Sequence, residues 1–170
     1  MTQARSVTMK GNPVSLSGDL VAVDAPAPEA VVLDNELGQV SLSAYRGKVL
    51  IISAVPSLDT PVCDIQTRRF NQEAAGLGDD VNVLTISMDL PFAQKRWCAS
   101  AGVERVITLS DHRYASFGRA YGLLIEDLRL LARAVMVVDR QGIVRYLQLV
   151  EEVTEEPDYE KAIQAARKIL

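Results

Sequence analysis

The sequence is poor in the residues that build metal sites and covalent cross-links. Its 170 residues include two cysteines and one histidine, so a four-ligand zinc site would need carboxylates to complete it. Cys63 and Cys98 lie far apart, and in a reducing compartment such a pair is more often catalytic or inert than a permanent cross-link. We therefore expect neither a metal nor any other cofactor.

Long hydrophobic runs and an excess of positive charge are also lacking. No apolar stretch approaches the length of a membrane span, and residues 1–18 lack the apolar core of a signal peptide. The 18 basic and 22 acidic residues give a net charge of −4, which argues against nucleic acid as the main partner. The sequence thus predicts a cytoplasmic protein without a nucleic-acid or membrane partner.

Hydrophobic residues, by contrast, are plentiful and make up 48% of the chain. A chain of this length and composition can bury a core without disulfides or a structural metal. It contains no internal repeat and no low-complexity stretch. We therefore expect residues 1–170 to form a single domain.

The order of apolar segments indicates an α/β fold. Residues 49–55 form a near-continuous apolar run, typical of a central strand covered on both faces. The other expected strands are 31–33, 39–42, 81–87, 106–109, 134–138 and 143–150, and the expected helices are 61–77, 89–101, 114–121 and 158–170. Strands that alternate with helices, followed by a hairpin and a last helix, predict a mixed sheet flanked by helices.

An additional β-hairpin is expected near the N-terminus. Residues 12–23 contain two short apolar segments, and Gly18-Asp19 between them is suited to a turn. The sequence therefore predicts that residues 1–23 form an N-terminal hairpin extension of the domain.

The segment from Pro56 to Cys63 joins the expected central strand to a helix. Thr60 suits the N-cap and Pro61 the first helical position, so Cys63 falls in the first turn. Free backbone N–H groups and the helix dipole favour an anion there. Open α/β sheets also place their active sites at this end of a strand. This placement points to chemistry, although a lone cysteine is otherwise usually a small core residue.

A nearby cation would be needed to ionise such a thiol. Lowering a thiol pKa from about 8.5 to about 6 takes roughly 3.4 kcal/mol, and a helix terminus supplies typically about 0.3–1 kcal/mol. Arg133 interrupts an apolar stretch, where a charge needs a partner or a function. Its donors could hold a thiolate and the oxygens of a bound substrate, as could the Thr60 hydroxyl. Taken alone, Arg133 could instead reach solvent at a strand edge, and Thr60 could be only a helix cap.

Several segments resemble those of a known family. Pro56, Thr60 and Cys63 match the Pro-x-x-x-Thr-x-x-Cys signature of the peroxiredoxins. The segments that are similar to the bacterial thiol peroxidase subfamily extend over most of the chain in the right order: 57–63, 89–98, 106–111, 131–135 and 156–159. The sequence thus resembles an atypical two-cysteine peroxiredoxin of this subfamily.

The resemblance implies a thioredoxin-like fold and a thiol-dependent peroxidase that reduces hydrogen peroxide and alkyl hydroperoxides. It implies that Cys63 is the peroxidatic nucleophile, which becomes a sulfenic acid, and that Cys98 is the resolving cysteine of an intramolecular disulfide. It further implies a shaping role for Pro56 and activating roles for Thr60 and Arg133. Thioredoxin is the implied reductant, and a homodimer the implied assembly.

Both cysteines are expected on helices, whereas a disulfide needs Cα atoms about 4.4–6.8 Å apart. We therefore predict that the first turn around Cys63 and the end of the helix that carries Cys98 unwind in each cycle.

Other functions remain open on the sequence alone. A peroxide sensor that passes its oxidation to a partner protein could carry the same residues. A disulfide oxidoreductase of thioredoxin type is disfavoured, because the sequence contains no Cys-x-x-Cys. A non-catalytic interaction module with a thioredoxin-like fold would need neither cysteine. Apart from the resemblance, Cys98 could be a packing residue beside Trp97.

Overall fold

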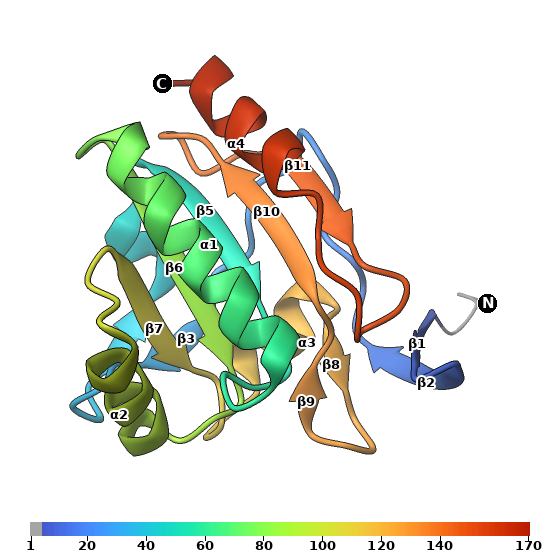
Figure 1. Ribbon diagram of the computed structural model, residues 1–170. Helices are drawn as coiled ribbons and strands as arrows, with labels where there is room; N and C mark the ends of the chain where they lie inside the picture. The colour runs from blue at the N-terminus through green and yellow to red at the C-terminus, as the bar shows by residue number, and fades with distance from the viewer. Residues whose placement is uncertain (1–4) are drawn as a thin grey trace.

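A seven-stranded mixed sheet forms the centre of the molecule (Figure 1). The computed structural model describes residues 5–170. The strands follow the order β11 (Val144–Leu149), β10 (Ala134–Val138), β5 (Val49–Ala54), β6 (Val81–Ser87), β7 (Val106–Ser110), β3 (Val31–Leu33) and β4 (Gln39–Ser41). Strands β5, β6 and β7 are parallel, and the other pairings are antiparallel. The predicted mixed sheet is confirmed, and β10 and β11 form the hairpin expected before the last helix.

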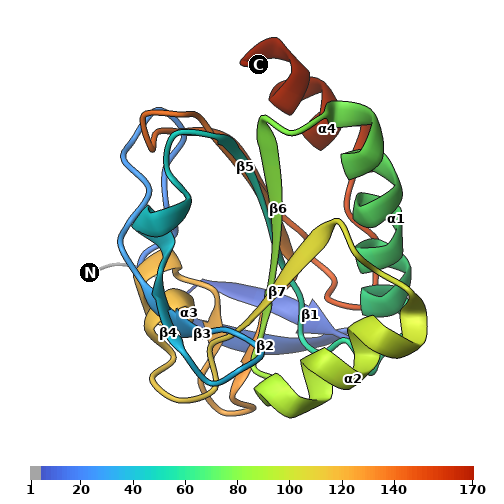
Figure 2. The same ribbon diagram turned by 90° about the vertical axis from the view of Figure 1, so that its left-hand side faces the viewer.

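Helices cover both faces of this sheet (Figure 2). One face carries α1 (Pro61–Leu77), α2 (Pro91–Ala101) and α4 (Tyr159–Lys168), and the other carries α3 (Ser116–Tyr121) and the 3-10 helix η1 (Leu42–Tyr45). Within residues 5–170, no helix has the length and apolar character that a bilayer crossing requires.

Strand β5 shows why the sheet is covered on both sides. All six of its residues are buried, and alternate side chains point to opposite faces. Ile51 belongs to the core under α1, with Phe70, while Ile52 belongs to the core on the α3 side, with Phe117. The end of β5 is therefore a fixed point from which the chain enters α1.

The N-terminal hairpin differs from the prediction in its register. It consists of β1 (Ser6–Met9) and β2 (Asn12–Ser17), so the predicted turn at Gly18-Asp19 is wrong. The chain instead turns at Lys10 and Gly11, both at positive φ, which glycine adopts without strain. Strand β2 then pairs with the distant β8 (Leu124–Ile125), which pairs with β9 (Leu130–Leu131). Residues 1–4 of the predicted extension lie outside the described residues.

The hairpin is fastened to the segment that follows β11. The amide of Thr8 donates to the carbonyl of Glu151 at 2.7 Å, and the amide of Val153 donates to the carbonyl of Thr8 at 2.8 Å. The amide of Gly11 also donates to the Glu152 carboxylate at 2.8 Å. The N-terminal hairpin and residues 151–153 therefore form one unit.

Candidate active site

Cys63 lies in the first turn of α1, directly after the end of β5. Thr60 is the N-cap residue and Pro61 the first helical residue, in agreement with the sequence prediction. The Cys63 side chain has no exposed surface and packs with Val55, Leu58 and Trp97. The thiol is therefore held in a closed apolar setting at the start of a helix, where backbone N–H groups are free to face an anion.

Arg133 brings its guanidinium to this thiol from the position directly before β10. Its Nη2 donates to the Cys63 sulfur at 3.2 Å, although the two residues are 70 positions apart. Nη1 donates to the Gln66 amide oxygen at 2.7 Å, and Nε donates to the Val153 carbonyl at 2.8 Å. With 2% of its surface exposed, Arg133 does not reach solvent, so the strand-edge alternative is wrong.

The charge on Arg133 has no carboxylate to balance it. Across residues 5–170, every ion pair with a carboxylate involves another basic residue. Two of its three hydrogen-bond partners are neutral oxygens, and the third, the Cys63 sulfur, can become an anion. Because a buried charge is costly without a counter-charge, this arrangement favours the thiolate of Cys63.

Gln66 is a site residue to which the sequence analysis assigned no role. It lies one helical turn after Cys63 and is buried, and its amide nitrogen donates to the Ser53 hydroxyl of β5 at 2.6 Å. Its amide oxygen accepts from Arg133, so Ser53 and Gln66 together fix the guanidinium. The available signal was a polar residue three positions after Cys63, on the same helix face.

Thr60 and Pro56 lie at the site, but the Thr60 hydroxyl is not directed at the thiol. It donates to the carbonyl of Ser57 at 3.0 Å, and the Thr60 amide donates to the same oxygen at 3.2 Å. The hydroxyl is thus used to close the turn before α1, and a direct bond to Cys63, which the sequence suggested, is not formed.

A largely apolar pocket of about 350 Å³ opens beside the thiol. Pro56, Thr60 and Arg133 are among its lining residues, whereas Cys63 is not, so the sulfur lies behind this wall. The other lining residues come from the hairpin, the loop before α1, the start of α1, β9 and the segment after β11: Met9, Lys10, Ser57, Pro61, Val62, Leu130, Val153 and Thr154.

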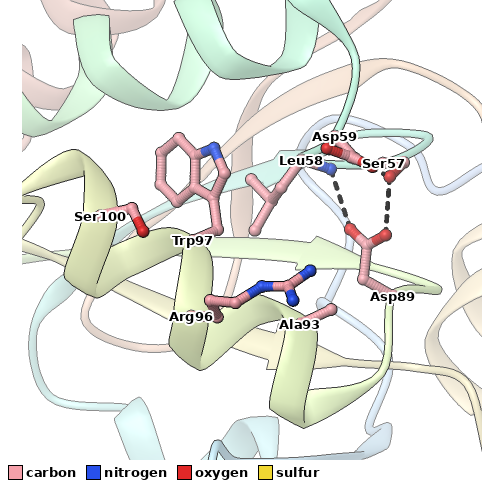
Figure 3. Close-up of a pocket in the computed structure, with 8 residues that line it drawn as sticks. All are labelled: Ser57, Leu58, Asp59, Asp89, Ala93, Arg96, Trp97 and Ser100. Atoms are coloured by element: carbon pink, nitrogen blue, oxygen red, sulfur yellow. Dashed lines mark hydrogen bonds between the residues drawn. The ribbon is translucent and has the colours of Figure 1, made fainter.

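Asp89 fixes the loop that precedes α1. Its carboxylate accepts hydrogen bonds from the Ser57 hydroxyl at 2.6 Å and the Leu58 amide at 2.8 Å (Figure 3). It also accepts from the Ser87 hydroxyl at 2.7 Å. The helix expected over residues 89–101 begins only at Pro91, with Leu90 as its N-cap, so Asp89 lies before the helix. The carboxylate instead binds the loop, where it satisfies a backbone amide beside the thiol.

Cys98 lies near the end of α2 in a different environment. Its sulfur is 3.5 Å from the Thr108 hydroxyl of β7, which donates in turn to Asn35 at 3.0 Å. Burial raises the pKa of the Cys98 thiol above its ordinary value, although the contact with Thr108 lowers it in part. The thiol is half-buried rather than freely accessible, and both cysteines are free thiols.

Between residues 5 and 170, no group of three or more histidine, cysteine, aspartate and glutamate side chains is placed to hold a metal ion.

Comparison with known proteins shows the family of the chain. The profile of the Redoxin family matches residues 22–163. The thiol peroxidase of Halalkalibacterium halodurans is 59% identical over 165 residues, which are 97% of this chain and 99% of that protein. The chain belongs to the redoxin family, in its bacterial thiol peroxidase branch. The thiol peroxidase of Bacillus subtilis is 57% identical, with 96% of this chain and 98% of that protein covered.

Solved structures of redoxin proteins share the fold. A peroxiredoxin-like protein from Aquifex aeolicus superposes with a TM-score of 0.91 at 45% identity, with 98% of each chain covered. Thiol peroxidase from Chromobacterium violaceum, at 17% identity, superposes with a TM-score of 0.85 and 98% of each chain covered, which supports the fold alone. The predicted thioredoxin-like α/β fold is thereby confirmed.

As a member of this branch, the chain is a peroxidase of the oxidoreductase class. Its activity is thiol-dependent, with a hydroperoxide as the substrate and a thiol as the reductant. The resemblance stated from the sequence is confirmed at this level.

Proposed function

We propose that this redoxin reduces hydrogen peroxide and alkyl hydroperoxides through a Cys63 sulfenic acid and an intramolecular Cys63–Cys98 disulfide. One observation carries the proposal: the buried guanidinium of Arg133 donates to the Cys63 sulfur and has no carboxylate partner in the described part of the chain. A buried guanidinium that donates to a sulfur in this way favours the thiolate, which is the nucleophilic form of cysteine.

In the first step, the Cys63 thiolate attacks the terminal oxygen of the hydroperoxide, and the O–O bond breaks. The leaving alkoxide or hydroxide takes up a proton, and Cys63 becomes a sulfenic acid by losing two electrons. The negative charge moves from the sulfur to the leaving oxygen, so Arg133 can stabilise it throughout by donating to the peroxide oxygens. Pro56 and Thr60 would shape the wall through which the peroxide approaches.

In the second step, the Cys98 thiol attacks the sulfenic sulfur, and water leaves as the disulfide forms. Cys98 now faces Thr108, whereas Cys63 packs against Trp97, so both segments must rearrange. We propose that the first turn of α1 and the end of α2 unwind in this step. A dithiol of thioredoxin would then reduce the disulfide by exchange.

The shape of the pocket supports organic hydroperoxides as substrates. Met9, Val62, Leu130 and Val153 provide apolar surface beside Arg133, against which an alkyl group can be buried. Hydrogen peroxide gains nothing from this surface, but it can reach the same guanidinium.

The proposal includes a cytoplasmic location and a homodimer. Leu90 and Phe92, at the start of α2, are 52% and 64% exposed and offer apolar surface for contact with a second copy. Light scattering of the reduced protein at micromolar concentration should give the mass of a dimer, and the mass of a monomer would contradict this assembly.

Steady-state assays with thioredoxin and its reductase test the proposed function. Wild type should consume both hydrogen peroxide and cumene hydroperoxide through many turnovers, and Cys63→Ser should be inactive with either. Cys98→Ser should form the sulfenic acid but lose turnover with thioredoxin.

Two results would contradict the proposal. Consumption that stops after one equivalent would indicate a peroxide sensor. A disulfide-linked dimer as the main oxidised product, lost in Cys98→Ser, would exclude intramolecular closure.

A further inference from the structure

Helices α1 and α2 are joined by a small polar contact beside the two cysteines. The indole N–H of Trp97 on α2 donates to the Asp64 carboxylate on α1 at 2.9 Å. The other oxygen of this carboxylate accepts from Arg68 Nε at 2.9 Å. Arg68 also lies over the indole ring at 5.6 Å and donates to the carbonyl of Ala101, the last residue of α2, at 3.3 Å. We call Asp64, Arg68 and Trp97 the interhelical clasp.

The clasp adjoins both cysteines, because Asp64 directly follows Cys63 and Trp97 directly precedes Cys98. Trp97 is directed from α2 toward α1, beside Leu58 (Figure 3), and its ring belongs to the packing around Cys63. Cys98 is the next residue in the helix, about 100° around the axis, and it faces Thr108 instead. For Cys98 to approach Cys63, this part of α2 must unwind and rotate, and Trp97 must leave its position.

We propose that Asp64, Arg68 and Trp97 are positioning residues that hold Cys98 away from Cys63 and thereby limit the rate of disulfide formation. The inference rests on the proposed Cys63–Cys98 disulfide. While the clasp is closed, the sulfenic acid of Cys63 persists and can meet a second hydroperoxide. That peroxide transfers an oxygen to the sulfur, giving a sulfinic acid, and leaves as water or an alcohol. The clasp thus sets the balance between recycling and irreversible oxidation.

Two variants open the clasp while conserving its packing. Trp97→Phe keeps an aromatic ring but removes the N–H donor, and Asp64→Asn keeps the shape of the side chain but removes its charge. Glu73→Gln is a matched control, because Glu73 pairs with Arg69 four residues before it on the same helix and is not bonded to α2. Circular dichroism verifies that each variant is folded.

The peroxide concentration that converts half of Cys63 to sulfinic acid in one oxidation measures the balance directly. Intact mass spectrometry after quenching gives this value, which depends on the second step and not on the rate of the first. We expect it to rise about tenfold in Trp97→Phe and Asp64→Asn, as for the loss of one hydrogen bond to a charged group, and to stay unchanged in Glu73→Gln.

Stopped-flow fluorescence provides a second readout, because Trp97 is the only tryptophan of the sequence. In wild type and Asp64→Asn, its emission should change at the rate at which the disulfide forms.

The clasp would be overturned if the peroxide concentration that converts half of Cys63 to sulfinic acid were equal to or below the wild-type value in both variants. Failure of wild type to form the Cys63–Cys98 disulfide would instead overturn the proposed function, so the two failures are distinguishable.

Discussion

At the scale of single residues, the site depends on how one guanidinium is satisfied. Arg133 is buried, and each of its three nitrogen atoms donates a hydrogen bond. Two of these bonds go to oxygens that cannot change their charge, so the thiol is the partner whose ionisation balances the site. Arg133 therefore connects β10 to α1 and to the segment after β11 through buried hydrogen bonds, and its charge favours the thiolate of Cys63.

Gln66 is expected to affect both stability and activity, because it holds the guanidinium of Arg133. In Gln66→Leu, Nη1 of Arg133 and the hydroxyl of Ser53 both lose their partner inside the core. We expect the free energy of unfolding to fall by about 1–3 kcal/mol, and kcat/KM for peroxide to fall as the guanidinium loses its fixed position.

Chemical denaturation and peroxide kinetics measure the two effects separately. Gln141→Leu, a substitution at an exposed turn residue, is the control and should change neither. Unchanged kinetics in Gln66→Leu would show that Gln66 does not position Arg133.

Glu152 should make the stability of the fold depend on pH through its contacts with the N-terminal hairpin. The Thr154 hydroxyl, followed by the backbone amides of Thr154 and Gly11, lowers the pKa of Glu152 to about 2 from its ordinary value near 4.5. A carboxyl with a lowered pKa in the folded state stabilises the fold fully above its ordinary pKa, and this contribution is lost as the pH falls toward 2.

Thermal melts of wild type and Glu152→Gln over a pH series test this coupling. The variant should melt at a lower temperature than wild type above about pH 5, and the difference should shrink between pH 4.5 and 2. A difference that is constant over the whole series would contradict a role for this carboxylate charge.

At the scale of elements, the β1–β2 hairpin forms part of the pocket in which we propose that the substrate binds. Met9 and Lys10 line it, and the hairpin is bonded to residues 151–153, where the Val153 carbonyl holds Arg133. The hairpin is thus connected to the thiol through a short chain of contacts, although Cys63 and Arg133 are far from it in the sequence.

Met9 should affect the choice of substrate more than the chemistry. Met9→Ser removes apolar pocket surface, so we expect kcat/KM for cumene hydroperoxide to fall about tenfold, which is the lower end of the range for losing one fully buried apolar side chain. The value for hydrogen peroxide should stay within about twofold. Equal losses with both substrates would mean that the hairpin supports the fold and not the binding of the alkyl group.

Local sequence patterns predicted most of the elements that carry the site. The apolar run 49–55 and the Thr60-Pro61-Val62-Cys63 start of α1 contain their own signals, because a buried strand and a helix cap depend on neighbouring residues. The hairpin register could not be predicted in this way. Strand β2 is positioned by pairing with β8, more than 100 residues later, and β8 and β9 are too short to show periodicity.

The site was likewise only partly predictable from the sequence. Arg133 was recognisable as a charge in an apolar stretch, but its partners Gln66 and Val153 follow from tertiary packing. Asp89 illustrates the limit, because its position before Pro91 suits a cap, yet the approach of the Ser57–Leu58 loop offers it stronger donors.

At the scale of the whole molecule, the fold places the two cysteines in different environments. Cys63 belongs to the cluster between β5 and α1, and Cys98 contacts β7. The parallel strands β5, β6 and β7 form a rigid centre, whereas α2 is a short helix at the side of the sheet (Figure 2). Rearrangement during the cycle should therefore be confined to the helices.

Amide hydrogen exchange in the two redox states tests this confinement. We expect residues 61–64 and 91–101 to exchange faster in the disulfide form than in the reduced form, because their helical hydrogen bonds are broken. Amides of β5 should stay equally protected in both. Identical exchange in α2 would contradict the predicted unwinding.

The central claim is that a guanidinium from β10 keeps the Cys63 sulfur ionised at the start of α1. Thiolate absorbance at 240 nm across a pH series measures this directly in the Cys98→Ser protein, where Cys63 is the one remaining thiol. The absorbance should already be near its maximum at pH 7, and Arg133→Met should require alkaline pH to reach it. The account would be contradicted if Cys63 in the Cys98→Ser protein, with Arg133 present, ionised only around pH 8.5, like free cysteine.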